Sequence, residues 1–225
     1  MTNIVLLVFV LVAAFMPVTV KAENVPAIVV EQCRKAVARQ NPVRITYNYG
    51  ELIFDSTKSI AEISRSCGNN AAGCFKSLEK GCASTLQTKN IKINGYNCLY
   101  TVAEVICDFS GAHLDINGEY KGCNARAVLR HELQHFMNWK TAKENLVREL
   151  KEKLTTFVIN NITVCKDDCQ HNIAYGFSKY KQKIENKWYL LKQANDYLLD
   201  EVDHDYANQV NYTVCAPYSL EFGLN

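Results

Sequence analysis

Two long stretches of helical periodicity in the C-terminal half of the chain constrain its fold more than any other feature. From Asn124 onward, apolar and aromatic residues recur in steps of three and four, with Lys, Arg and Glu between them. This first stripe consists of His135, Trp139, Ala142, Leu146, Leu150, Leu154 and Phe157. After the interruption INNITVCKDDCQHN, a second pattern runs from about Ile173 to Val210, with the seam Phe177, Ile184, Trp188, Leu191, Leu198 and Val202. Two long helices joined by a short break predict an antiparallel helical hairpin.

The N-terminal half carries shorter signals of mixed type. A short helix is predicted within residues 24–42, and residues 43–50 alternate apolar with polar residues as a strand does. Residues 67–97 are rich in Gly, Asn, Ser and Cys, and we expect this region to be mostly irregular. The β-branched and aromatic residues of 98–116 predict one or two strands with a turn at Ser110-Gly111. The predicted fold is therefore α+β, with a small antiparallel or mixed sheet followed by the long helical hairpin.

The first residues have the composition of an export signal. An apolar run from Ile4 to about Phe15 is too short for a membrane span, and the ending Val20-Lys21-Ala22 suits signal peptidase. We therefore expect residues 1–22 to be a cleaved signal peptide and residues 23–225 to form one domain, secreted or periplasmic. No later apolar run is long enough to cross a bilayer, so no membrane span is expected after signal removal.

Ten cysteines follow the predicted signal, and their number is even. They are Cys33, Cys67, Cys74, Cys82, Cys98, Cys107, Cys123, Cys165, Cys169 and Cys215. In an exported chain, disulfides are the default state of such a set, and the spacings do not match a zinc ribbon. The sequence predicts a disulfide-rich fold, although it does not determine which cysteines pair.

The stretch LRHELQHFMNW, residues 129–139, carries the chemistry-bearing motif H-E-x-x-H. His131 and His135 are four residues apart, so on a helix both imidazoles lie on one face and can bind one Zn²⁺ ion. Glu132 is rotated about 100° from His131, which suits a general base acting on a metal-activated water rather than a ligand. A catalytic zinc site uses three protein ligands with one position open, so a third ligand is required.

The hairpin geometry predicts where that ligand lies. With the turn centred near residue 167, a residue opposite position 133 falls near 201, in the acidic segment DEVDHDY, residues 200–206. Continuing the apolar seam along the second helix leads to Asp205, which we predict as the third metal ligand. His204 remains an alternative, because a register error of one residue would promote it, and Glu201 is a further alternative from the same acidic segment.

The motif RHELQHF resembles that of the zincin metalloproteases. More narrowly, residues from about 95 to 211 resemble a bacterial family described as secreted zinc-dependent proteases, in which a second helix ends in a Tyr-Asp-x-x-Thr-x-His-Gly motif. Of that motif only Asp205 is matched here, and the Thr, His and Gly positions are replaced. The resemblance implies a zincin-like catalytic domain in which an edge strand holds the substrate, and CLYTVAEVIC, residues 98–107, would fill that role.

The expected function is a secreted zinc-dependent endopeptidase whose partner is a peptide or protein substrate. A net charge near +2 gives no strong electrostatic attraction to nucleic acid, which is not expected as a partner. One alternative is a disulfide-stapled secreted binding protein with a structural or degenerate zinc site. Another is a hydrolase that attacks a different bond, such as an ester or a cell-wall amide.

Overall fold

The computed structural model of the chain describes residues 25–68, 71–77, 81–119 and 122–209, with backbone alone for 123–124 and 201–209. The helices are α1 (Ala27–Arg39), α2 (Ile60–Cys67), α3 (Cys123–Asn160) and α4 (Ala174–Gln209). The strands are β1 (Val43–Asn48), β2 (Ile53–Lys58), β3 (Gly73–Lys76), β4 (Cys82–Ile93), β5 (Tyr96–Asp108), β6 (His113–Asn117) and β7 (Thr163–Cys165). The predicted α+β class is confirmed, and the predicted signal peptide lies outside the described residues.

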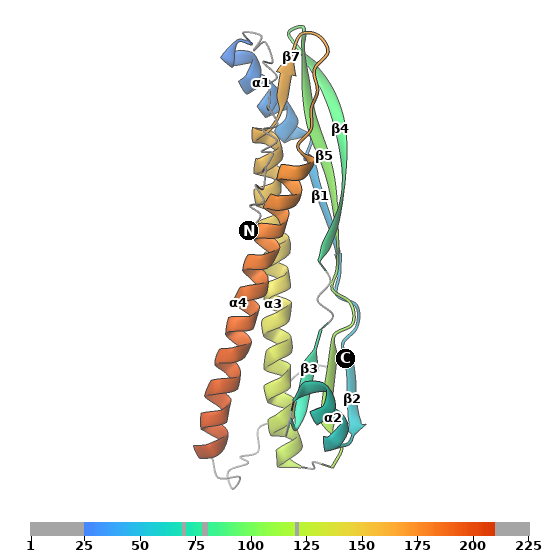
Figure 1. Cartoon of the computed structure of the whole chain (residues 1–225), viewed down its shortest axis with the longest axis vertical. Coiled ribbons are helices and arrows are strands. Elements are labelled where there is room, and N and C mark those ends of the chain that lie inside the picture. Colours follow the sequence, from blue (N-terminus) through green and yellow to red (C-terminus); the bar gives the residue numbers. More distant parts are fainter. Residues whose placement is uncertain (1–24, 69–70, 78–80, 120–121, 210–225) are drawn as a thin grey trace, which may run out of the picture.

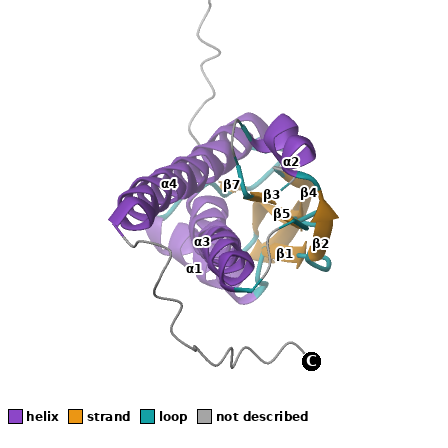
Figure 2. Ribbon diagram, turned by 90° about the horizontal axis from the view of Figure 1, so that it is seen from below, coloured by secondary structure: helices purple, strands orange, loops and turns teal. Residues whose placement is uncertain are grey.

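The molecule is elongated and has two layers. Helices α3 and α4 run side by side along its length, and two sheets follow one another along the opposite side (Figures 1 and 2). The larger sheet has the order β1-β5-β4, with the short β7 also paired to β5. The smaller sheet has the order β2-β6-β3. Because β1 and β5 are parallel, as are β2 and β6, the chain crosses from the larger to the smaller sheet twice in the same direction.

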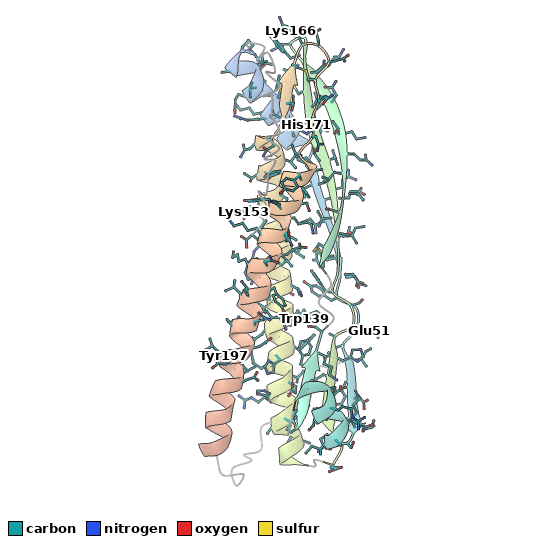
Figure 3. The ribbon with its side chains drawn as sticks, in the orientation of Figure 1. Glu51, Trp139, Lys153, Lys166, His171 and Tyr197 are labelled. Carbon is teal, nitrogen blue, oxygen red and sulfur yellow. A yellow bond between two sulfur atoms is a disulfide. The ribbon has the colours of Figure 1, made fainter. Side chains whose placement is uncertain are left out.

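The apolar stripe predicted for the first long helix forms the core face of α3. Its members Trp139, Ala142, Leu146, Leu150 and Leu154 are all buried. Trp139 and the three leucines pack together with Val105 and other side chains of β5, and with Phe177 and Ile184 from α4. Trp139 lies on α3 at the level where the larger sheet ends and the smaller sheet begins (Figure 3). Its ring contacts Tyr49, Phe75 and Phe136.

The seam predicted for the second helix is correct only in its first half. Phe177 and Ile184 are buried and Trp188 is partly buried, but Leu191 and Leu198 are 42% and 59% exposed. Beyond Trp188 the less exposed side chains are Lys192, Asp196 and Leu199. Beyond Trp188, the side of α4 that faces α3 is therefore shifted by about one residue from the predicted seam, and it carries the charged residues Lys192 and Asp196.

The prediction of a mostly irregular region at residues 67–97 is wrong. This region contains β3 and the 12-residue strand β4, which pairs with β5 along its whole length. The connection between β4 and β5 is the dipeptide Asn94-Gly95, and both residues have positive φ, 52° and 80°. Asn-Gly between two extended runs is a strong hairpin signal, because both central residues of the favoured turn require positive φ. The many cysteines and polar residues of the region concealed this signal.

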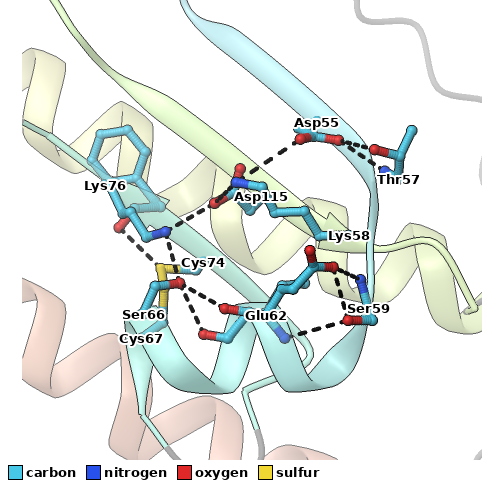
Figure 4. Close-up of polar contacts among 12 residues, drawn as sticks. Asp55, Thr57, Lys58, Ser59, Glu62, Ser66, Cys67, Cys74, Lys76 and Asp115 are labelled. Carbon is cyan, nitrogen blue, oxygen red and sulfur yellow. Dashed lines mark hydrogen bonds and ion pairs between the residues drawn. A yellow bond between two sulfur atoms is a disulfide. The ribbon is translucent and has the colours of Figure 1, made fainter.

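A polar cluster ties α2 to the smaller sheet (Figure 4). The carboxylate of Asp115 on β6 is 1% exposed and lies 2.7 Å from Lys58 Nζ on β2 and 2.9 Å from Lys76 Nζ on β3. Lys76 also donates to Ser66 Oγ on α2 at 2.8 Å. Burial by itself would raise the pKa of Asp115, but the hydrogen bonds from the two lysines outweigh it and leave the pKa lowered. These contacts link β2, β3, β6 and α2 to one another.

The prediction that the cysteines form disulfides is confirmed for the eight whose sulfur atoms are described. The pairs are Cys33–Cys98, Cys67–Cys74, Cys82–Cys107 and Cys165–Cys169. Cys215 and the side chain of Cys123 lie outside the described part of the chain. The four described disulfides join α1 to β5, α2 to β3, β4 to β5, and β7 to the loop that follows it.

Candidate metal centre

His131 and His135 lie one turn apart near the start of α3 and face α4. Their Nε2 atoms are 3.0 Å apart, and the ring centroids are 4.7 Å apart. The side chain of His131 is 25% exposed and that of His135 is 11% exposed. The spacing of four residues thus produces the shared orientation of both imidazoles that the sequence predicted.

Helix α4 supplies a third potential ligand, Asp200. Its Oδ1 atom lies 3.0 Å from His135 Nε2 and 3.4 Å from His131 Nε2. In a tetrahedral zinc site with bonds of about 2.0–2.1 Å, neighbouring ligand atoms are about 3.3 Å apart. The two nitrogens and the oxygen therefore already form a triangle of the size that a tetrahedral cation requires. Among the described residues, these three form the group able to hold a metal ion.

A second acid on α4 orients one of the histidines. Asp196 Oδ1 lies 3.2 Å from His135 Nδ1, and Asp196 Oδ2 lies 3.1 Å from Lys192 Nζ. In the neutral tautomer that donates from Nδ1 to Asp196, His135 presents the lone pair of Nε2 to the triangle. Burial alone would lower the pKa of His135, but the hydrogen bond to Asp196 and the charge of Asp200 outweigh it, so the pKa is raised. A proton and a cation thus compete for this imidazole.

Glu132 lies on a different face of α3, against β3 rather than against α4. Its side chain is buried, with 6% exposure, and its Oε2 accepts a hydrogen bond of 2.7 Å from the Phe75 backbone N–H. The strand lies so close that a Cβ atom on Gly73 would be 2.5 Å from Val128 Cγ1 and 2.8 Å from Glu132 Cγ. Burial raises the pKa of Glu132, while the charges of His131 and His135 and the Phe75 N–H act in the opposite direction.

Asp205, the predicted third ligand, lies on α4, but its side chain is outside the described part of the structure, as are those of His204 and Glu201. That assignment stays a prediction. Asp200 belongs to the segment 200–206 to which the hairpin geometry led, so the predicted level along the helix pair agrees with the structure. Asp196 was missed, although its spacing of four residues from Asp200 places both carboxylates on one helix face.

Strand β5 does not have the free edge that the resemblance to zincins implied for residues 98–107. It pairs with β4 from Tyr96 to Cys107 and, on its other side, with β1 from Ala103 to Asp108 and with β7 from Asn97 to Leu99. An interior strand cannot accept a substrate as an added strand, because its backbone groups are already paired. The expectation of a substrate-holding edge in this segment is therefore wrong.

No protein-family model, curated protein or solved structure matches this chain. The resemblance to the zincins therefore depends on the motif residues alone. Within the described residues, no helix combines the length and the apolar composition that a bilayer crossing requires.

Proposed function

We propose that this chain is an exported zinc-dependent hydrolase of peptide bonds, with His131, His135 and Asp200 as its metal ligands. The observation that carries the proposal is the triangle of their ligand atoms, with edges of 3.0, 3.0 and 3.4 Å. Two imidazoles and one carboxylate are the donor set of a catalytic zinc site that keeps one position open. Asp200 is 52% exposed, so a substrate can approach the centre from solvent.

Each residue of the centre has a distinct part in the proposed reaction. When bound, zinc lowers the pKa of a coordinated water toward neutrality and polarises a carbonyl oxygen. Asp196 holds the imidazole of His135 in the orientation that a ligand needs. Glu132 accepts a proton as the peptide bond is attacked and returns it to the leaving amine, for which a pKa raised by burial suits it. The Phe75 N–H fixes one of its two carboxylate oxygens.

Export and peptide specificity are proposed from observations other than the donor set. The four disulfides fit an oxidising, extracytoplasmic environment. A peptide substrate is proposed because the H-E-x-x-H motif with its glutamate resembles that of the zincins. An ester or cell-wall amide would meet the same chemistry, and a panel containing all three substrate types separates these possibilities.

Zinc stoichiometry and turnover, measured on matched variants, test the proposal. The wild type should bind one zinc per chain, and Asp200→Ala should bind zinc at least about 100-fold more weakly. Glu132→Gln should retain the zinc and lose turnover of denatured protein substrates by about 100-fold or more. Asp205→Ala is the matched control on the same helix. If Asp205→Ala loses the metal and Asp200→Ala keeps it, the ligand is Asp205. A wild type that binds no zinc contradicts the proposal.

One observation favours a second candidate, a secreted binding protein with a structural metal site. Glu132 is buried beneath β3 and hydrogen-bonded to it, which is also how a purely structural carboxylate would be held. In that case wild type and Glu132→Gln would bind zinc equally and both would lack turnover. Cobalt substitution provides an independent measurement, because the visible spectrum of a site with an open position changes when small anions are added.

A further inference from the structure

The last part of α4 whose side chains are described lacks the apolar packing that holds the part of the helix before it. We call residues 189–200 the distal segment. None of its 12 residues is buried, and nine are exposed. Leu190, Tyr197 and Leu198 are 62%, 64% and 59% exposed. By contrast, the preceding part of α4 buries Phe177 and Ile184 in the main core.

Three polar contacts between the distal segment and α3 lie at the candidate metal centre. Asp196 and Asp200 reach His135 at 3.2 and 3.0 Å, and Asp200 also reaches His131 at 3.4 Å. Closer to the turn of the hairpin, the polar contact between the helices lies beside a buried apolar core. There Glu149 Oε2 accepts hydrogen bonds from Lys187 and Trp188. The distal segment combines an exposed apolar surface with attachment through potential metal ligands.

Weak attachment follows from these contacts when no cation is bound. Partly exposed ion pairs contribute little to docking because solvent screens them. A helical stretch of about 12 residues is marginal by itself in water.

We propose that cation binding docks the distal segment onto α3, so that the metal centre controls the position of this part of α4 as well as its chemistry. The inference rests on the proposed metal centre, because two ligands come from α3 and the third from the distal segment. A cation bound by all three residues binds only the docked arrangement and therefore stabilises it by mass action. At free zinc about 100 times the Kd, local opening should be suppressed about 100-fold.

Hydrogen exchange of the full chain, with either zinc or EDTA, tests the proposal. Backbone amides of residues 189–200 should exchange about 100-fold more slowly with zinc, while those of 177–188 should be unaffected. Trypsin provides a second readout, because cleavage after Lys192 should accelerate in EDTA. Equal exchange rates in the two conditions, with one zinc bound per chain in the zinc sample, would overturn the proposal.

Three variants separate this inference from the proposed hydrolase activity. Asp200→Asn should abolish the zinc-dependent protection, whereas Leu190→Ala, on the exposed face of the same segment, should retain it. Glu132→Gln should lose turnover and still show the protection. If the wild type shows the protection but no turnover, the hydrolase proposal fails and the docking inference stands. If no zinc binds, both fail.

Discussion

At the scale of single residues, the candidate metal centre includes side chains that would not bind the metal themselves. Asp196 is the clearest of these, because it contacts the Nδ1 atom of His135 and leaves Nε2 to face Asp200. It is in turn paired with Lys192 on the preceding turn of α4. A carboxylate in this position fixes both the tautomer and the orientation of a histidine ligand.

Replacement of Asp196 tests that role. Asp196→Ala should weaken zinc binding by about 10- to 100-fold, because His135 loses the partner that orients its ring. The affinity is measured by competition with a chromogenic chelator. Gln193→Ala is the control, since Gln193 lies on the same helix and hydrogen-bonds to Tyr189 rather than to the centre. An unchanged affinity of Asp196→Ala would contradict the role.

Gly73 has a steric role at the other side of α3. Gly73→Ala should destabilise the fold by about 1–3 kcal/mol, because the added Cβ would overlap Val128 and Glu132. Gly81→Ala is a matched control, since its Cβ would meet its nearest neighbour, Glu185 Oε1, at 3.6 Å. Urea unfolding of both variants measures the difference. Equal midpoints would show that β3 does not press on Glu132.

At the scale of elements, the short strand β7, which pairs with β5, is also linked to it through a histidine. His171 Nε2 lies 3.0 Å from Thr101 Oγ1 on β5, and its Nδ1 lies 3.0 Å from Thr163 Oγ1 on β7. The ring of His171 is partly buried between these two strands. The loop after β7 folds back over the sheet and brings the ring there.

This attachment predicts an acid-sensitive element. Burial lowers the pKa of His171 below its ordinary value of 6.5, so the folded protein binds this proton less tightly than the unfolded chain does. The stability that neutral His171 supplies is therefore complete above about pH 6.5 and declines as the pH falls through the lowered pKa. Exchange of the β7 amides should accelerate between pH 7 and pH 5 after correction for intrinsic rates. In His171→Gln this additional acceleration should disappear, whereas its persistence would assign the effect to another group.

At the scale of the whole molecule, the disulfides differ in how much of the chain each one constrains. Cys33–Cys98 closes 65 residues and attaches α1 to the larger sheet, whereas Cys165–Cys169 closes four residues within one loop. In the chain-entropy description, a disulfide stabilises a fold by restricting the unfolded state, and long loops gain more.

Removal of these two disulfides should therefore have unequal effects. Replacing Cys33 and Cys98 by Ser should cost about 4 kcal/mol, and replacing Cys165 and Cys169 should cost about 2 kcal/mol. Chemical unfolding of the two double variants measures the difference. If loss of the four-residue loop were the more costly, native packing rather than chain entropy would determine the contribution.

Several features followed from local sequence because their causes are local. The periods of three and four set both long helices, and a spacing of four placed His131 and His135 on one face. The even number of cysteines after a predicted export signal predicted disulfides. Even Asn94-Gly95, which we overlooked, was a readable signal, since the backbone conformation of a tight turn depends on the residues within it.

Other features depend on contacts between distant parts of the chain, and only the tertiary structure decided them. Which acidic side chain contacts the histidines depends on how the two long helices pack. Beyond Trp188, the face of α4 that contacts α3 is shifted by one residue from the predicted seam, and this shift brings Asp196 and Asp200 to His135. The burial of Glu132 depends on contact with β3, whose residue Phe75 lies 57 residues before Glu132 in the sequence. Side-chain packing and strand order determine these contacts, and neither is encoded in any short window of the sequence.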